Sequence, residues 1–419
     1  MELSPGYKQT DAGLIPSDWE VRPLADLADK IMVGIASAAT HAYRPTGVPL
    51  LRNQNIRSGH LDDRDLLFVD PAYEIVFKNK RLRGGDLLTA RTGYPGTTCV
   101  VPPSYDLAQS FTTLITRPKK GEIDSLYLCH YVNSEQGQTF FTQGQIGGAQ
   151  KNVNAGTLRQ MPIPTPPLPE QRAIAAALSD VDALLDGLDR LIAKKRDLKQ
   201  AAMQQLLTGQ TRLPGFHGEW EVKRLGDVAE IVSGGTPRTN EPSYWNGGIK
   251  WCTPTDITRY AGKYLTETER SISRDGLKYS GAALLPVGAL LLCSRATIGE
   301  LKIAGAPVCT NQGFKSLVCR PEASNEFLYY KLLTMKQKMV ERAFGSTFLE
   351  ISTPNVSALE VAAPPHDEQV AIAAVLSDMD AELATLEARR DKTRHLKQAM
   401  MQELLTGKTR LVPTGGARV

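Results

Sequence analysis

Two stretches of this chain occur twice. Residues 170–185 read EQRAIAAALSDVDALL and residues 368–383 read EQVAIAAVLSDMDAEL; LKQAAMQQLLTGQTRL at 198–213 returns as LKQAMMQELLTGKTRL at 396–411. The offset is 198 residues throughout, and 28 of the 44 positions from 170 to 213 are identical in the second copy. Chance does not produce such agreement, so the chain contains an internal duplication that decides its architecture.

The repeated stretches are predicted to be long helices. Their apolar residues recur at steps of four and three, the heptad pattern of a coiled coil. Proline-rich approaches at 166–169 and 364–365 suit the helix starts, and Gly209 and Gly407 suit the ends. Each helix would run about 34 residues, or roughly 50 Å at 1.5 Å per residue. The apolar positions are Ile174, Leu178, Val181, Leu185, Leu188 and Ile192, then Ile372, Leu376, Met379, Leu383 and Leu386.

Pairing of the two copies would give an antiparallel coil. This coil is either a plain structural element or a spacer that holds two globular domains at a fixed separation, and the circular form of the duplication favours a spacer. The duplication is circular because Thr10 precedes Trp19 as Thr211 precedes Trp220, so the N-terminal segment matches the tail that follows each helix.

The repeat continues upstream with fewer identities, as in WEVRPLADLAD at Trp19 and WEVKRLGDVAE at Trp220. Strands are predicted at Gly85–Ala90, Ser110–Arg117, Ala289–Ser294 and Lys315–Cys319, and helices at Ser125–Gln136 and Asn325–Ala343. The fold class is therefore α/β (mixed α+β): two globular domains joined by two long antiparallel coiled-coil helices in a pseudo-two-fold circular tandem repeat. The predicted parts are a first globular domain (1–165), a central helix (166–215), a second globular domain (216–363), a C-terminal helix (364–413) and a flexible tail (414–419).

Composition excludes several classes of protein. The 419 residues suffice for two to four domains, and 42% hydrophobic with 22% charged residues excludes a disordered or fibrous chain. No apolar run approaches about 18 residues, so we expect no transmembrane helix and no membrane partner. The N-terminus does not resemble a signal peptide. Six cysteines without a CxxC pair are predicted to be free thiols in a reducing cytoplasm.

Enzyme motifs are incomplete. Gly407-Lys408-Thr409 resembles the end of a phosphate-binding loop, but the glycine needed upstream is replaced by Gln402, so a helix cap is the better interpretation. The six histidines have no metal-ligand spacing, and no nucleophile elbow occurs. We therefore predict no catalytic residues, no metal site and no cofactor bound by this chain.

Polar and aromatic clusters in the expected loops are candidates for DNA contact. The net charge of +4 is small, so any nucleic-acid binding must come from local patches. Arginine, asparagine and glutamine bind base edges, and lysine mostly binds phosphate. Taken singly, each cluster fits an ordinary solvated loop better. The candidates are Arg52, Asn53, Asn55, Arg57, Lys78, Lys80, Arg91, Thr92 and Tyr94 in the first domain, and Arg238, Asn240, Tyr244, Trp245, Thr253, Thr255, Arg259 and Arg295 in the second.

Outward-facing positions of the two helices are nearly identical. Both copies can then present one surface to two copies of the same partner. The candidate partner-binding residues are Lys199, Gln200, Gln204, Lys397, Gln398 and Gln402.

Several of these motifs resemble one family. They are Gly13-Leu14-Ile15-Pro16 with Trp19, Leu51–Ile56, Asn311–Phe314, Pro169-Glu170-Gln171 with Glu368-Gln369, and Lys-Gln-Ala-x-Met-Gln-x-Leu-Leu-Thr-Gly-x-Thr-Arg-Leu at 199–213 and 397–411. Together they resemble the specificity (S) subunit of type I restriction–modification systems, over essentially the whole chain.

The resemblance implies a division of labour. Each variable domain would read one half of a split, asymmetric site in double-stranded DNA. The helices would set the gap and dock two methyltransferase (M) subunits, which use S-adenosylmethionine to methylate adenine N6. Restriction (R) subunits that use ATP and Mg²⁺ would complete the complex. This chain would then be non-catalytic.

Two alternatives stay open. One is an S-like subunit of a fused restriction–modification enzyme of another type, in which the methylating chain also cleaves. The other is a coiled-coil scaffold without a role in DNA binding.

Overall fold

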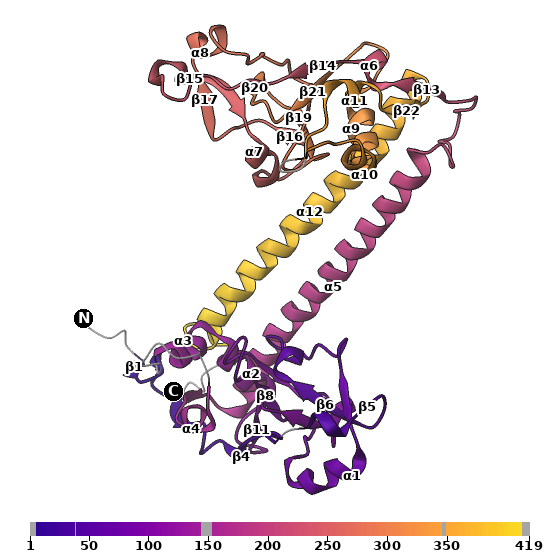
Figure 1. Ribbon diagram of the computed structural model, residues 1–419. Helices are drawn as coiled ribbons and strands as arrows, with labels where there is room; N and C mark the ends of the chain where they lie inside the picture. Colours follow the sequence, from indigo (N-terminus) through magenta and orange to yellow (C-terminus); the bar gives the residue numbers. More distant parts are fainter. Residues whose placement is uncertain (1–5, 38, 144–152, 346–348, 413–419) are drawn as a thin grey trace. The chain divides into compact units, whose positions relative to one another are not determined.

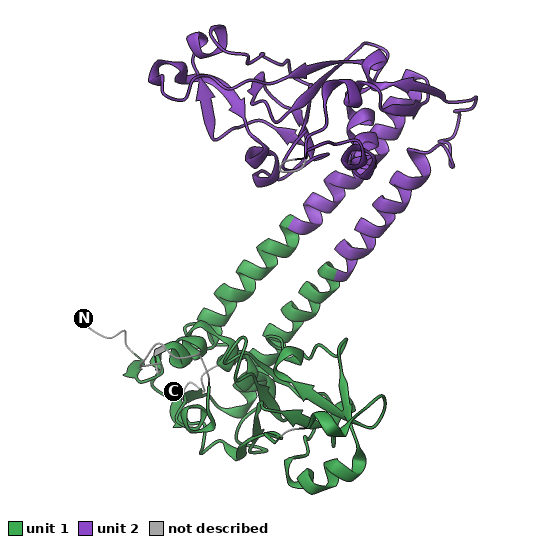
Figure 2. Cartoon of the chain, in the orientation of Figure 1, with its two compact units in different colours: residues 1–189, 388–419 green, residues 190–387 purple. Residues whose placement is uncertain are grey.

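The computed structural model of the protein describes residues 6–37, 39–143, 153–345 and 349–412. The tail predicted at 414–419 lies outside them. The chain folds into two compact units, unit 1 (residues 1–189 and 388–419) and unit 2 (residues 190–387) (Figure 2). Helices and strands occur in both units, so the predicted mixed α and β class is confirmed (Figure 1).

Unit 1 is built on two four-stranded sheets, ordered β10-β6-β7-β5 and β4-β11-β8-β9, and two short pairs, β1-β2 and β12-β3. Its strands are β1 (Tyr7–Thr10), β2 (Gly13–Pro16), β3 (Glu20–Pro23), β4 (Ala28–Val33), β5 (Tyr43–Arg44), β6 (Val48–Arg52), β7 (Leu67–Val69), β8 (Leu87–Thr89), β9 (Thr98–Val100), β10 (Gln109–Phe111), β11 (Leu114–Pro118) and β12 (Pro162–Thr165). Its helices include α1 (Pro71–Glu74), α2 (Ser125–Asn133), α3 (Glu135–Gln143) and α4 (Ala155–Arg159), with 3₁₀ turns η1 (Thr40–Ala42), η2 (Asn53–Asn55), η3 (Ile75–Lys80) and η4 (Pro103–Tyr105).

Unit 2 repeats this plan with a five-stranded sheet, β14-β21-β18-β19-β16, a three-stranded sheet, β17-β15-β20, and the pair β13-β22. Its strands are β13 (Glu221–Arg224), β14 (Ala229–Ser233), β15 (Trp245–Cys252), β16 (Tyr264–Leu265), β17 (Arg270–Ile272), β18 (Leu290–Leu292), β19 (Leu301–Ala304), β20 (Val308–Thr310), β21 (Lys315–Cys319) and β22 (Glu360–Ala363). Its helices include α6 (Leu225–Val228), α7 (Pro254–Arg259), α8 (Arg274–Lys278), α9 (Asn325–Leu333), α10 (Lys336–Glu341) and α11 (Thr353–Ser357), with the 3₁₀ turn η5 (Pro242–Tyr244).

Three of the predicted short elements are interrupted. The strand expected over Ser110–Arg117 is split into β10 and β11 because Thr112 takes a φ of +55°, outside the range of an extended strand. The helix expected over Ser125–Gln136 ends at Asn133, since Ser134 is extended with a ψ of 167°. The helix expected over Asn325–Ala343 likewise separates into α9 and α10.

The repeated stretches form α5 (Leu168–Leu206) and α12 (His366–Leu404), each of 39 residues. They begin beside the prolines and end just before Gly209 and Gly407, whose φ values of +74° and +69° suit a glycine that closes a helix. The long helices and their ends are therefore as predicted, although each is about a turn longer. None of the described helices combines the length and the apolar character needed to cross a membrane.

Each unit contains one segment of both long helices, and these segments pair in antiparallel fashion. In unit 1, Asp182 pairs with Lys397 at 2.5 Å and Asp189 pairs with Arg394 at 3.3 Å. In unit 2, Lys199 pairs with Asp380 and Arg196 with Glu387. In both units, the residue number of the α12 partner falls as the residue number along α5 rises, as it must when two helices run antiparallel. The heptad positions near each helix start do more than pair the helices, because Ile174 and Leu178 belong to the core of unit 1. Their repeat equivalents, Ile372 and Leu376, belong to the core of unit 2.

A glutamine at the start of each long helix attaches it to the sheets. The amide of Gln171 accepts a hydrogen bond from the backbone N–H of Asp124, the N-cap of α2, at 2.8 Å, and donates to the carbonyl of Pro166 at 2.9 Å. Gln369 does the same in unit 2, where it accepts from the N–H of Ser324 at 2.9 Å and donates to Pro364 at 2.9 Å. This repeated bonding explains why the glutamine occurs in both copies.

The preceding glutamate closes each unit. Glu170 is 2% exposed and accepts two hydrogen bonds from the guanidinium of Arg410, at 2.5 and 2.7 Å. Glu368, 1% exposed, accepts the same pair from Arg212 at 2.6 and 2.5 Å. Arg410, which follows α12, thus completes unit 1, and Arg212, which follows α5, completes unit 2 in the same way. This agrees with the circular repeat expected from the sequence.

Removal of the arginine should therefore destabilise its unit. We expect Arg410→Ala to lower the free energy of unfolding by about 3 kcal/mol, because it leaves the buried Glu170 carboxylate without its cation. Urea denaturation followed by circular dichroism measures this loss. Lys408→Ala, an exposed cation two residues away, is the control and should change stability by less than about 0.5 kcal/mol. Equal effects of the two substitutions would contradict the role given to Arg410.

Candidate nucleic-acid interface

Several strands of unit 1 end at one edge. Val33 of β4 and Thr89 of β8 both lie opposite Leu114 of β11, and Arg52 at the end of β6 lies opposite Phe111 of β10. The loops that leave this edge contain most of the residues predicted to contact DNA in the first domain. The strands therefore bring together clusters that are up to 40 residues apart in the sequence.

Asn53 connects three of these segments. Its side-chain carbonyl accepts a hydrogen bond from the backbone N–H of Arg91 at 2.8 Å, and its amide donates to the hydroxyl of Thr112 at 3.2 Å. Both polar groups of Asn53 are thereby engaged within the protein. Thr92 and Tyr94 follow in the same loop as exposed side chains, and Tyr94 is 75% exposed.

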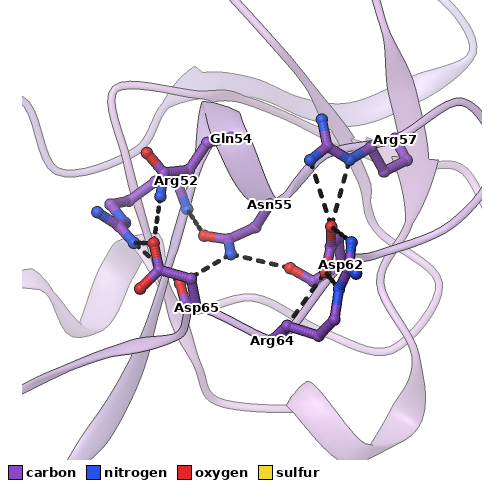
Figure 3. Close-up of polar contacts among 7 residues, drawn as sticks. All are labelled: Arg52, Gln54, Asn55, Arg57, Asp62, Arg64 and Asp65. Atoms are coloured by element: carbon purple, nitrogen blue, oxygen red, sulfur yellow. Dashed lines mark hydrogen bonds and ion pairs between the residues drawn. The ribbon is translucent and has the colours of Figure 1, made fainter. Parts of the chain in front are cut away.

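Asn55 is buried, with 2% exposure, and its side chain shapes the loop beside it (Figure 3). Its amide donates to the backbone carbonyls of Asp62 and Asp65, at 2.9 and 3.1 Å, and its carbonyl accepts from the N–H of Arg52 at 2.9 Å. Because these bonds use its polar atoms inside the fold, Asn55 acts in this structure as a support for its neighbours. Arg52 and Arg57, by contrast, reach the surface, with 22% and 43% of their side chains exposed.

The two lysines predicted for this domain lie on η3. Lys78 is exposed. Lys80 is partly buried and donates to the carbonyl of Gly34 at 2.8 Å, just after β4 ends. Lys80 therefore fastens η3 to the strand-end edge, and Lys78 is the freer cation of the two.

Unit 2 has an equivalent edge. Ser233 of β14 lies opposite Lys315 of β21, and Cys252 of β15 lies opposite Thr310 of β20. The loop after β14 carries Arg238 and Asn240, both exposed. The candidate residues of the second domain are thus placed on the same part of the framework as those of the first.

Two aromatic side chains, Tyr244 and Trp245, lie where the loop after β14 enters β15. The indole N–H of Trp245 donates to the carbonyl of Arg238 at 3.1 Å, and the guanidinium of Arg270 lies 3.7 Å from the centre of the Trp245 ring. Tyr244 stacks on Tyr279 with ring centres 6.2 Å apart. These contacts hold the aromatic groups in place, which lowers the entropic cost of using them in binding.

The remaining candidates of unit 2 have mixed roles. Thr253 is the N-cap residue of α7, and its backbone N–H and its hydroxyl donate to the Asp256 carboxylate at 2.7 and 2.8 Å, whereas Thr255 is exposed. Arg259 is exposed and pairs with Glu269 at 2.8 Å. Arg295 is half-buried and its backbone bridges to Glu350.

The six helix candidates divide into two groups. Lys199 and Lys397 form ion pairs within the protein, and only 19% and 17% of their side chains are exposed. Gln200, Gln204 and Gln398 are exposed. Gln402 is also exposed and donates to Glu135 at 3.0 Å. The lysines therefore join the helices, and the glutamines form the outer surface.

Polar groups beside the helix pair also differ between the units. His130 lies 3.4 Å from the hydroxyl of Ser179, and its burial, reinforced by the charge of Lys397, lowers its pKa to about 4. In unit 2, Tyr330 takes this place: its hydroxyl lies 3.4 Å from that of Ser377, the repeat equivalent of Ser179, and donates to Asp380 at 2.6 Å. A neutral imidazole and a phenol thus serve as alternative supports for the same helix position.

Sequence reasoning missed Asp62, Arg64, Asp65, Glu269 and Arg270. The signal available was the charged run Asp62-Asp63-Arg64-Asp65, which follows the first cluster closely. The importance of Arg270 has no comparable signal, since its partner Trp245 is 25 residues away and only the pairing of β15 with β17 joins them.

The described residues were also considered as metal ligands and as reactive thiols. Within those ranges, no group of three or more His, Cys, Asp or Glu side chains could hold a metal ion. All six cysteines are free. Burial raises the pKa of Cys129 to about 12, so this thiol stays protonated at neutral pH.

The chain thus contains two mixed α/β units of one plan, and each unit includes a segment of both long helices. The two units carry different polar loops on similar strands, which is the architecture of a protein with two binding domains. The chain belongs to the type I restriction–modification DNA specificity family. The family model described as "Type I restriction modification DNA specificity domain" matches residues 16–194 and 217–393. The resemblance found in the sequence motifs is therefore confirmed.

Individual relatives agree with this assignment. The type I restriction enzyme MjaIX specificity subunit of Methanocaldococcus jannaschii is 38% identical over 164 residues, which is 39% of this chain and 38% of that relative. The putative MjaX specificity subunit of the same organism is 26% identical over 425 residues, 97% of both chains. The S subunit structure from M. genitalium is 16% identical, has a TM-score of 0.60, and covers 96% of this chain and 99% of its own, a likeness of fold.

The amide of Asn55 provides a test of how the interface is built. Asn55→Ala removes the hydrogen bonds to the backbone of residues 62 and 65, so we expect the free energy of unfolding to fall by about 1–3 kcal/mol. Amide hydrogen exchange across residues 62–65 should become faster. Thr92→Ala, an exposed position on the same edge, is the control and should leave both quantities unchanged. Unaltered exchange in Asn55→Ala would show that its amide does not hold this loop.

Proposed function

We propose that this chain is the non-catalytic DNA-specificity subunit of a type I restriction–modification complex and that each unit reads one half of a bipartite, asymmetric site. The observation that carries the proposal is the shared strand-end edge. Unit 1 displays Arg52, Arg57 and Tyr94 there, whereas unit 2 displays Thr255 and Arg259. One framework with two different sets of exposed side chains suits two different half-sites.

The side chains at these edges have the chemistry for reading DNA. Guanidinium groups form paired hydrogen bonds with guanine, threonine hydroxyls bind several base edges, and aromatic rings contact apolar base surfaces. We assign Lys78, an exposed lysine, to phosphate contact, which adds affinity without sequence information. Arg238, Asn240 and Arg295 extend the set in unit 2. Asn53, Asn55 and Thr253 support the loops, so we assign them to positioning.

The helices suit a spacer and a docking surface. Each is a continuous run of 39 residues, and the two are tied in each unit by ion pairs. In unit 1, a groove of about 330 Å³ lies beside Gln398 and Gln402, between the end of α12 and the α2–α3 turn. We assign the exposed glutamines, including Gln200 and Gln204, to contacts with two methyltransferase subunits.

The partners would supply the chemistry. The methyltransferase subunits bind S-adenosylmethionine and transfer its methyl group to adenine N6, after the base leaves the helical stack. Restriction subunits use ATP and Mg²⁺. The assembled complex would act in the cytoplasm. The role of this chain is to choose the sequence on which the others act.

The central test is methylation of host DNA. Long-read sequencing for N6-methyladenine should find a split, asymmetric motif that disappears when the gene is deleted. Exchange of residues 1–165 for those of another family member should then change only one half of the motif. Loss of no motif on deletion, with the partner genes expressed, would contradict the function. A change in both halves would contradict the assignment of one half-site to each unit.

The spacer role predicts a second change. Insertion of seven residues after Lys194 in α5, with seven after Arg389 in α12, preserves the heptad phase and lengthens both helices by about 10 Å. The gap between half-sites should grow by about three base pairs, at 3.4 Å each, while both half-sites stay the same. Methylation sequencing measures the gap. Lys194→Ala adds no length and is the control. An unchanged gap would refute the spacer.

A further inference from the structure

Cations on the unit 1 edge are already paired with carboxylates before any DNA is bound (Figure 3). Arg52 donates to both the backbone carbonyl and the carboxylate of Asp65, at 2.9 Å each, and Gln54 donates to the same carboxylate at 2.6 Å. Arg57 and Arg64 both pair with Asp62, at 3.2 and 2.7 Å. Side chains with base-reading chemistry are thus held by two acids of one loop.

Unit 2 has the same arrangement with a different sequence. Arg259 pairs with Glu269 at 2.8 Å, and Lys250 pairs with Glu267 at 3.3 Å. In unit 1 the acidic segment lies just before β7, which pairs antiparallel with β6. In unit 2 it lies just before β17, which pairs antiparallel with β15. The two loops share little sequence, so the pairing has arisen on the same part of the framework with different side chains.

A buried side chain positions the acidic segment in each unit. Asn55 donates to the backbone of residues 62 and 65, and Asp256, its repeat equivalent at an offset of 201, accepts from the backbone N–H of Glu269 at 2.9 Å. Both supports are nearly inaccessible, with exposures of 2% and 1%. The backbone of each acidic segment is therefore fixed by a buried side chain, unlike that of an ordinary surface ion pair between mobile side chains.

The outer acids remain accessible to a competing anion. The side chain of Asp65 is 72% exposed and that of Glu269 is 60% exposed. Asp62 differs, since only 13% of it is exposed, and its hydrogen bond with Arg64 holds its pKa well below the usual range. Asp65 and Glu269 are thus the members that a phosphate group can displace from their cations.

We propose that Asp65 and Glu269 compete with DNA phosphates for Arg52 and Arg259 and so weaken binding to DNA that offers phosphates alone. This inference rests on the proposed function. Non-target DNA offers mainly phosphates, which must displace a carboxylate to reach each arginine. Target DNA adds base-edge hydrogen bonds that offset this displacement. The acids therefore weaken binding to non-target DNA, which has no base-edge hydrogen bonds to offset the displacement.

The expected effect follows from the exposure of the pairs. An exposed ion pair is worth little, so removing one acid should tighten non-target binding by about two- to fivefold. Each arginine freed from its acid counts as about one additional phosphate contact. The slope of log affinity against log salt concentration should then steepen by up to about 0.9 per substitution.

The test compares charge-matched variants of the full chain. Asp65→Asn and Glu269→Gln are measured beside Glu122→Gln and Glu221→Gln, which remove acids paired with Arg22 and Lys223 outside the strand-end edges. The probes are fluorescent 30-base-pair duplexes of alternating dA·dT and of alternating dG·dC, followed by anisotropy at several NaCl concentrations. Asp65→Glu, which keeps the charge, serves as the conservative variant. Thermal melting checks that all variants are folded.

The outcomes are distinct. Tighter binding and a steeper salt slope in Asp65→Asn and Glu269→Gln, beyond those of the two controls and absent in Asp65→Glu, support the competition. Equal changes in all four charge-removing variants would overturn it, since net charge alone would then explain them. Salt-dependent DNA binding by the unsubstituted chain keeps the proposed function intact in that case. Its absence would contradict the proposed function together with the role of the acids.

Discussion

The burial of a glutamate at the start of each long helix is the constraint on which the structure depends. A carboxylate at 1–2% exposure is tolerated only when a cation and hydrogen bonds replace its lost water. Arg410 meets this need for Glu170, and Arg212 meets it for Glu368. Each unit is therefore complete only when the tail that follows one long helix docks on the start of the other.

This closure recurs in both units, whereas the strand-end edges differ between them. The strands, the glutamine anchors and the helix pairs recur in both units, whereas the side chains at the strand-end edge do not. Asn55 and Asp256 lie where the shared framework meets the loops that differ between the units. Both are buried and both hold the backbone of a neighbouring loop, but one is an amide that donates and the other a carboxylate that accepts. A common framework can thus support loops of different sequence.

The sequence offered candidate residues for the site but not the role of each side chain. The candidates were chosen by residue type and expected loop position, and Asn53, Asn55 and Thr253 use their polar atoms within the fold. Residue type alone cannot show this, because an asparagine that reads a base and one that caps a turn look alike in sequence. The outward helix lysines were expected to face a partner, yet Lys199 and Lys397 pair with carboxylates of the facing helix.

The sequence by itself determined the duplication, the family, the two long helices and their ends, because these depend on periodicity and on local proline and glycine signals. Tertiary structure decided which charges meet. Arg410 and Glu170 are 240 residues apart, and Arg270 reaches Trp245 only because β15 and β17 pair. Ion pairs and hydrogen bonds between such distant residues follow from strand register and helix docking. Those are properties of the folded chain that no local pattern encodes.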